Sequence, residues 1–159
     1  MNNDIILRPA EMPDVRNIHL LLHDYAIQGV LLDRSEEDIA FYLKNFTVAV
    51  DSSNTLLGCM AVRDFGGELL EVRSLAIRSD LRKSGIGRKL VAKAIARLDE
   101  ELGNYRLFAL TLQPGFFERL GFEVVEKELF PEKIWADCSH CPKRECCDEI
   151  AVIYCGKKL

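Results

Sequence analysis

The first thirty residues predict a short strand followed by an amphipathic helix. Residues 4–7 form the strand, and Pro13 opens the helix, where a residue without an N–H group is tolerated. Gly29 marks the end of the helix. The apolar face of this helix, at 3.6-residue spacing, comprises Val15, Ile18, Leu22 and Tyr25.

A second, short helix is predicted to begin at Ser35, because Asp38 follows three positions later in a capping-box pattern. Its apolar residues, at helical spacing, are Ile39, Leu43 and Phe46. The spacing then changes to that of strands: residues 46–50 and 55–62 flank the polar turn DSSN and predict a β-hairpin.

Six further elements complete the pattern. They are strand 69–77, helix 85–102, strand 105–112, helix 114–120, strand 122–125 and strand 149–155. Helix 85–102 has the clearest apolar stripe, made of Val91, Ile95, Leu98 and Leu102. Because no repeat, low-complexity tract or linker divides the chain, we expect one α/β (α+β) domain over residues 1–159.

The composition excludes some classes of binding partner and location. Acidic residues outnumber basic ones 25 to 21, for a net charge of -4, which argues against nucleic acid or an anionic membrane as the partner of the whole surface. No stretch approaches the roughly 20 apolar residues of a membrane span, and the start resembles no secretion signal. We therefore expect a soluble, cytoplasmic protein.

Five basic residues cluster in the sequence around the predicted start of helix 85–102. The basic residues are Arg78, Arg82, Lys83, Arg88 and Lys89. A helix N-terminus offers unpaired N–H groups and a partial positive charge, and Gly85 and Gly87 would allow close backbone approach. Cations in the first turn oppose the helix dipole, so a bound anion would relieve the conflict. The alternative is a solvated basic helix start.

Two common nucleotide loops do not fit this segment. A P-loop requires G-x-x-x-x-G-K-[ST], and no glycine precedes Gly87 at that spacing. A dinucleotide fingerprint requires a third glycine where the chain has Leu90. The segment 82–87 instead matches R-x-x-G-x-G, and it follows a strand that contains L-A-I.

With this loop, the order of its elements and the later turn "FFERLGF", the chain resembles the GNAT superfamily of acetyl-CoA-dependent N-acetyltransferases. The resemblance covers almost the whole chain and implies a mixed, mostly antiparallel central sheet flanked by helices. It also implies that loop amides hold the CoA pyrophosphate while strand 69–77 faces the acetyl-pantetheine arm. The implied coenzyme-binding residues are Leu75, Ala76, Ile77, Arg82, Lys83, Ser84, Gly85, Ile86, Gly87 and Arg88.

Several stretches resemble the short N-acetylglutamate synthases of arginine biosynthesis: "YAIQGVLLDRSEEDI", "EVRSLAI", "LTLQPGFFERLGF" and "PEKIWADCSHCP". That branch usually has L-P-R-S where this chain has Asp33 in place of proline. The two carboxylates of L-glutamate require cations that bond in a forked geometry, and we expect Arg34 and Arg73, with Ser35, to bind it. The alternatives are a surface pair of Arg34 with Asp38, a role for Arg73 in balancing a neighbouring acid, and a capping role for Ser35.

Glu71 is the candidate general base, because the ammonium of an amino acid must lose a proton before it attacks a thioester. The alternative is a structural ion pair. In related acetyltransferases a backbone N–H near the position of Ile77 meets the oxyanion. Many members carry a tyrosine that protonates the departing sulfur, at the position of Phe117, so the general acid is left open.

Four of the six cysteines fall in the segment 138–147. The related synthases carry cysteines that match Cys138, Cys141 and Cys147, and C-x-x-C spacing lets two thiolates share a metal. A structural zinc and unligated reduced thiols are the two interpretations.

The sequence thus predicts transfer of acetyl from acetyl-CoA to the α-amine of L-glutamate, with a homodimer as the candidate assembly. One rival is an acetyltransferase of the same fold that acts on another small amine, amino acid or protein N-terminus. Another is a non-enzymatic CoA-sensing or zinc-dependent interaction module.

Overall fold

The structure is a computed structural model that describes residues 4–126 and 149–156. Its principal elements, in chain order, are β1 (Ile6–Pro9), α1 (Val15–Ile27), α2 (Glu36–Phe41), β2 (Phe46–Val50), β3 (Leu56–Asp64), β4 (Leu69–Ile77), α3 (Ile86–Glu101), β5 (Tyr105–Thr111), α4 (Pro114–Glu118), β6 (Glu123–Val125) and β7 (Ile150–Gly156). This order is the one that the sequence predicts.

The strands form a seven-stranded sheet in the order β1-β2-β3-β4-β5-β7-β6. Strand β4 pairs with β5 in parallel, with Glu71 opposite Phe108. The ladders of β1 with β2, β2 with β3, β5 with β7 and β6 with β7 are antiparallel. The predicted α/β class and the mixed, mostly antiparallel sheet are therefore confirmed.

The chain divides into two compact units. The first unit comprises the described residues of Met1–Val62 and Val72–Ala96, and the second those of Arg63–Glu71 and Arg97–Leu159. Strand β4 and helix α3 each contribute residues to both units. The expectation of a single domain over residues 1–159 stays a prediction.

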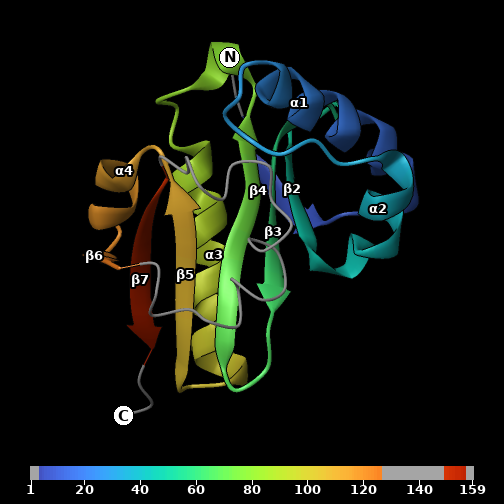
Figure 1. Cartoon of the computed structure of the whole chain (residues 1–159). Coiled ribbons are helices and arrows are strands. Elements are labelled where there is room, and N and C mark those ends of the chain that lie inside the picture. The colour runs from blue at the N-terminus through green and yellow to red at the C-terminus, as the bar shows by residue number, and fades with distance from the viewer. Residues whose placement is uncertain (1–3, 127–148, 157–159) are drawn as a thin grey trace. The chain divides into compact units, whose positions relative to one another are not determined.

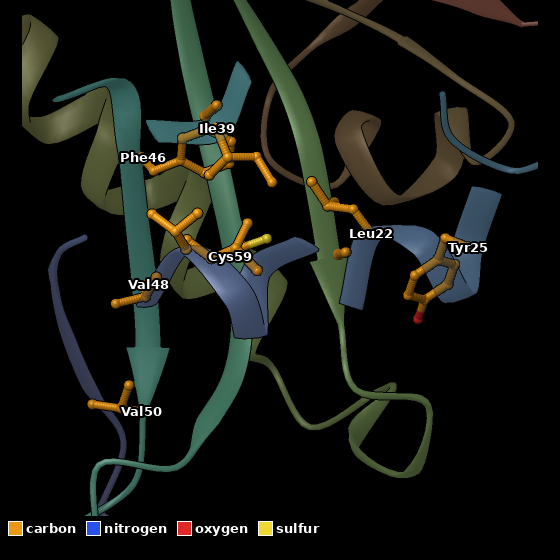
Figure 2. Close-up of a cluster of buried hydrophobic side chains, with 11 residues drawn as sticks. Leu22, Tyr25, Ile39, Phe46, Val48, Val50 and Cys59 are labelled. Carbon is orange, nitrogen blue, oxygen red and sulfur yellow. The ribbon is translucent and has the colours of Figure 1, made fainter. Parts of the chain in front are cut away.

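In the first unit, helices α1 and α2 pack on one face of strands β2 and β3 (Figure 1). Figure 2 shows this core, which includes Leu22, Tyr25, Ile39, Phe46, Val48, Val50 and Cys59. On the opposite face of β3, a β-carbon at Gly58 would lie 2.6 Å from Ile77 Cδ1 and 3.4 Å from Ile86 Cγ2. Because neighbouring strand residues alternate between faces, Gly58 lets the start of α3 approach β3 closely.

The second unit has its own apolar core between β4, β5 and β7. Leu69, Phe108, Ala151 and Ile153 are buried together. Strand β7 pairs along the whole of β5, from Tyr105 opposite Gly156 to Thr111 opposite Ile150.

Three local predictions were wrong. The first strand lies two residues later than predicted, at Ile6–Pro9. Phe46 begins β2 opposite Ala61, which confirms the predicted strand 46–50, but its placement on the helix was wrong, because α2 stops at Phe41 and residues 43–45 form a 3₁₀ turn. Ile39, Leu43 and Phe46 show helical spacing because all three pack in the same core, although they do not share a helix. Leu102 is 43% exposed, because α3 already ends at Glu101.

Candidate functional site

The connection from β4 to α3 is a tight loop with two left-handed residues. Lys83 has a φ of 69° and Gly85 a φ of 91°. Left-handed backbone suits glycine, and a β-carbon built on Gly85 would meet no atom within 4 Å. The loop therefore leaves an open cradle at Gly85.

Backbone donors gather at this cradle. The first hydrogen bond of α3 runs from the Lys89 amide to the Gly85 carbonyl at 3.0 Å. The amides of Ile86, Gly87 and Arg88 thus have no partner within the helix, as expected for a first turn. The Ser84 amide, in contrast, donates to the Leu81 carbonyl at 3.2 Å, so only the Ser84 hydroxyl is available to a ligand. This geometry suits the bound anion that the basic helix start predicts, and the diphosphate that the GNAT resemblance implies.

The five basic residues near the loop are not equivalent. Arg78 donates two hydrogen bonds to Asp80, at 3.1 and 2.6 Å, which raise the pKa of Arg78 and lower that of Asp80. Arg78 is therefore already paired. Lys83, Arg88 and Lys89 are exposed around the helix start.

Arg82 contacts Tyr25, which the hydrophobic pattern predicted only as a core residue. The Arg82 Nε donates to the Tyr25 hydroxyl at 3.3 Å, and the guanidinium lies 5.2 Å from the centroid of the Tyr25 ring. The same hydroxyl donates to the Ile77 carbonyl at 2.5 Å. A buried tyrosine hydroxyl needs a polar partner, which is the one signal that could have directed attention to Tyr25.

Arg34 is held against the core by several contacts. Its Nε donates to Asp38 at 2.6 Å and its Nη1 donates to the Ser74 hydroxyl at 3.2 Å. Its guanidinium carbon lies 5.1 Å from the centroid of the Phe46 ring, and the side chain is 14% exposed. The pair with Asp38, one of the two expected roles of Arg34, is confirmed. Ser35 caps α2, since its hydroxyl accepts from the Asp38 amide at 3.1 Å.

Ser74, the partner of Arg34 in β4, has a left-handed backbone with a φ of 55°. A non-glycine residue in this conformation within a strand is strained, and such strain is common at functional sites. The Ser74 carbonyl accepts from the Cys59 thiol at 3.4 Å. Burial raises the pKa of that thiol to about 12, so Cys59 stays protonated at neutral pH.

Two stacked histidines of α1 secure the loop that carries Arg34. His19 Nδ1 lies 2.7 Å from the Arg34 carbonyl, and His23 Nδ1 lies 3.2 Å from Asp33 Oδ2. Because a carbonyl only accepts, His19 must carry a proton on Nδ1. The residues before α2 are thereby fixed to α1.

The remaining candidates lie elsewhere in β4 or outside the described residues. Glu71 is 3% exposed and belongs to the second unit, whereas Arg73 is half-buried and belongs to the first. The catalytic role of Glu71 and the substrate role of Arg73 stay predictions.

The predicted zinc ligands Cys138, Cys141 and Cys147 fall outside the described residues. Within residues 4–126 and 149–156, no three His, Cys, Asp or Glu side chains gather in a way that could hold a metal ion. In the same part of the chain, no helix has the length and apolarity to cross a membrane.

Comparisons with known proteins agree with the fold. The family described as "Acetyltransferase (GNAT) domain" matches residues 43–124. A Chlorobaculum tepidum protein named "Uncharacterized N-acetyltransferase CT2212" is 45% identical over 150 residues, which cover 94% of this chain and 96% of that protein. The chain belongs to the GNAT family, and it is an N-acetyltransferase that uses acetyl-CoA.

More distant relatives are longer. The amino-acid acetyltransferase of Escherichia coli K12 is 31% identical over 128 residues, which cover 79% of this chain but 28% of that enzyme. The chain therefore spans less than a third of that relative.

Two solved structures share the fold. N-acetylglutamate synthase from Neisseria gonorrhoeae, complexed with coenzyme A and N-acetyl-glutamate, has a TM-score of 0.85 at 24% identity, over 99% of this chain and 36% of that one. Rv2747 from Mycobacterium tuberculosis, solved with CoA, has a TM-score of 0.77 at 26% identity, over 94% of this chain and 98% of that one.

Proposed function

We propose that this N-acetyltransferase acetylates the α-amine of L-glutamate and serves arginine biosynthesis. The observation that carries the proposal is the anchored guanidinium of Arg34, which is a fitting receptor for a substrate carboxylate. The relatives named amino-acid acetyltransferase and the likeness to N-acetylglutamate synthase support the same substrate class.

Some N–H groups of the Arg34 guanidinium remain available to a substrate. A guanidinium carries five N–H groups. Asp38 uses the Nε group and Ser74 uses one group of Nη1. Within the described residues, the second N–H of Nη1 and both groups of Nη2 have no hydrogen-bond partner. These N–H groups can donate hydrogen bonds to both oxygens of one carboxylate in a forked geometry.

The proposed reaction is direct attack in a ternary complex. Glu71 takes a proton from the substrate ammonium, directly or through water, and the free amine attacks the thioester carbon. A backbone N–H near Ile77 stabilises the oxyanion, the C–S bond then breaks so that CoA leaves as thiolate, and the new amide nitrogen gives up its remaining extra proton to the solvent.

Phe117 cannot protonate the leaving sulfur, because a phenyl ring carries no acidic proton; it serves as packing, buried against Phe116 and Phe122. The missing acid is tolerable, because a thiol with a pKa near about 8.5 leaves readily as thiolate. Thr111, half-buried at the end of β5, or a water is the remaining proton source.

The test is a steady-state screen of amino acids, polyamines and N-terminal peptides, with detection of released CoA thiol. The proposal predicts the highest kcat/KM with L-glutamate and a much lower value with L-glutamine, which lacks the second carboxylate. Efficient turnover of another amine with no preference for glutamate would assign the enzyme to a different acceptor. Absence of CoA release with every amine, with CoA binding retained, would instead indicate a binding module.

Variants of Arg34 test the receptor itself. Arg34→Ala should raise the KM for glutamate at least about 10-fold, as expected for loss of a charged hydrogen bond, and leave the KM for acetyl-CoA unchanged. Arg34→Lys keeps the charge without the fork and should recover only part of the loss. Equal effects on both KM values would remove Arg34 from the substrate site.

A further inference from the structure

We infer that Tyr25 is a positioning residue for the coenzyme, which holds Arg82 ready for the CoA diphosphate and fixes the end of β4. The inference rests on the diphosphate site proposed at Gly85–Gly87. Nothing in the sequence marked Tyr25 beyond its place on the apolar face of α1.

Tyr25 is 9% exposed, and its ring belongs to the core of the first unit. Figure 2 shows the ring at the edge of this cluster with its hydroxyl directed away from the other apolar side chains. A phenol in this position needs polar partners. It has two of opposite kind, because the hydroxyl donates to the Ile77 carbonyl and accepts from Arg82 Nε.

The peptide between Ile77 and Arg78 is consequently held at both ends. Tyr25 binds its carbonyl at 2.5 Å, while its N–H, which belongs to Arg78, donates to the Leu57 carbonyl at 2.9 Å. This peptide is the point where β4 ends and the loop begins. The orientation of the last strand residue is thus fixed by a helix 52 positions earlier in the sequence.

Arg82 gains a defined orientation from the same ring. Arg82 is exposed to solvent. An exposed arginine normally samples many rotamers, and it loses this conformational freedom when it binds an anion. The ring contact at 5.2 Å and the Nε bond at 3.3 Å restrict that freedom in advance. Among the described residues, the two Nη groups of Arg82 have no hydrogen-bond partner, so they remain for phosphate oxygens. This arrangement lowers the entropic cost of coenzyme binding.

The experiment is a double-mutant cycle on CoA affinity, measured by calorimetry with Tyr25→Phe, Arg82→Ala and the double variant. Tyr25→Phe retains the ring and should fold normally. It should weaken CoA binding about 5-fold, the effect of one lost hydrogen bond. In the Arg82→Ala background the same change should have less than about half that effect, because the partner is gone. In turnover, Tyr25→Phe should raise the KM for acetyl-CoA.

The matched control is Tyr105→Phe, in the second unit. This variant also removes a buried hydroxyl bond, since the Tyr105 hydroxyl donates to Asp99 at 2.7 Å. It should lower stability without a change in CoA affinity. Independent effects of Tyr25→Phe and Arg82→Ala, or an equal loss of affinity in Tyr105→Phe, would overturn the inference. An unchanged affinity in Arg82→Ala would overturn the role of Arg82 in the proposed diphosphate site, and with it this inference.

Discussion

A single methyl group at Gly85 should separate coenzyme binding from folding. In Gly85→Ala the new β-carbon meets no protein atom within 4 Å, so the variant introduces no clash. The backbone φ of 91° is unfavourable for any residue with a β-carbon and should cost about 1–2 kcal/mol of folding free energy. The methyl group would occupy the cradle proposed for the diphosphate. Loss of one charge-assisted amide contact there should weaken CoA binding about 10-fold or more.

Gly66→Ala is the control for this prediction. Gly66 has a φ of 83°, and a β-carbon there also meets nothing within 4 Å, but it lies in the turn between β3 and β4. Urea unfolding should show similar losses of stability in the two variants, and calorimetry should show reduced CoA affinity only in Gly85→Ala. Equal CoA affinity in both variants and the parent protein would refute the assignment of the cradle.

Three further variants test the packing that supports the site. Ser35→Ala removes the cap of α2 and should lower the free energy of unfolding by about 1 kcal/mol in urea titrations, an expectation that an unchanged midpoint would contradict. Cys59→Ala tests pH dependence: burial raises the thiol pKa from 9.0 to about 12, so the parent should lose up to about 1.4 kcal/mol per pH unit above pH 9 as the unfolded thiol ionises. The variant should lack the part of this slope that Cys59 contributes and keep the part at higher pH that comes from Tyr105, whose pKa burial also raises; identical slopes would argue against a buried neutral thiol. Gly156→Ala would bring a β-carbon 2.1 Å from Tyr105 Cε1 and should cost about 1–3 kcal/mol in thermal unfolding, whereas full stability would show that the ring moves freely.

Local patterns were sufficient to predict most of the fold. Strand β4 has the bounds that were predicted for it, and α3 begins one residue after the predicted start. These elements are encoded by the periodicity of neighbouring apolar residues and by glycine at their ends. The pattern was ambiguous at Phe46, where helical and strand spacing overlapped and long-range pairing with Ala61 decided the outcome.

The candidate site was only half predictable, because its contacts join distant positions. The loop of Gly85 and its neighbours is contiguous and carries a recognisable motif. The Arg34 bond to Ser74 spans 40 residues, and the Tyr25 bond to Ile77 spans 52. No periodicity encodes such partners. Of the side-chain contacts that Arg34 makes, the sequence predicted only the pair with Asp38, which lies four residues away.

The most direct test of the central claim is the amide NMR spectrum of ¹⁵N-labelled protein titrated with CoA and, separately, with pantetheine, which lacks the diphosphate. If the amides at the start of α3 bind the diphosphate, the Ile86, Gly87 and Arg88 signals should shift strongly with CoA and little with pantetheine. Unchanged signals from these three residues, in a protein that still binds CoA elsewhere, would contradict the account.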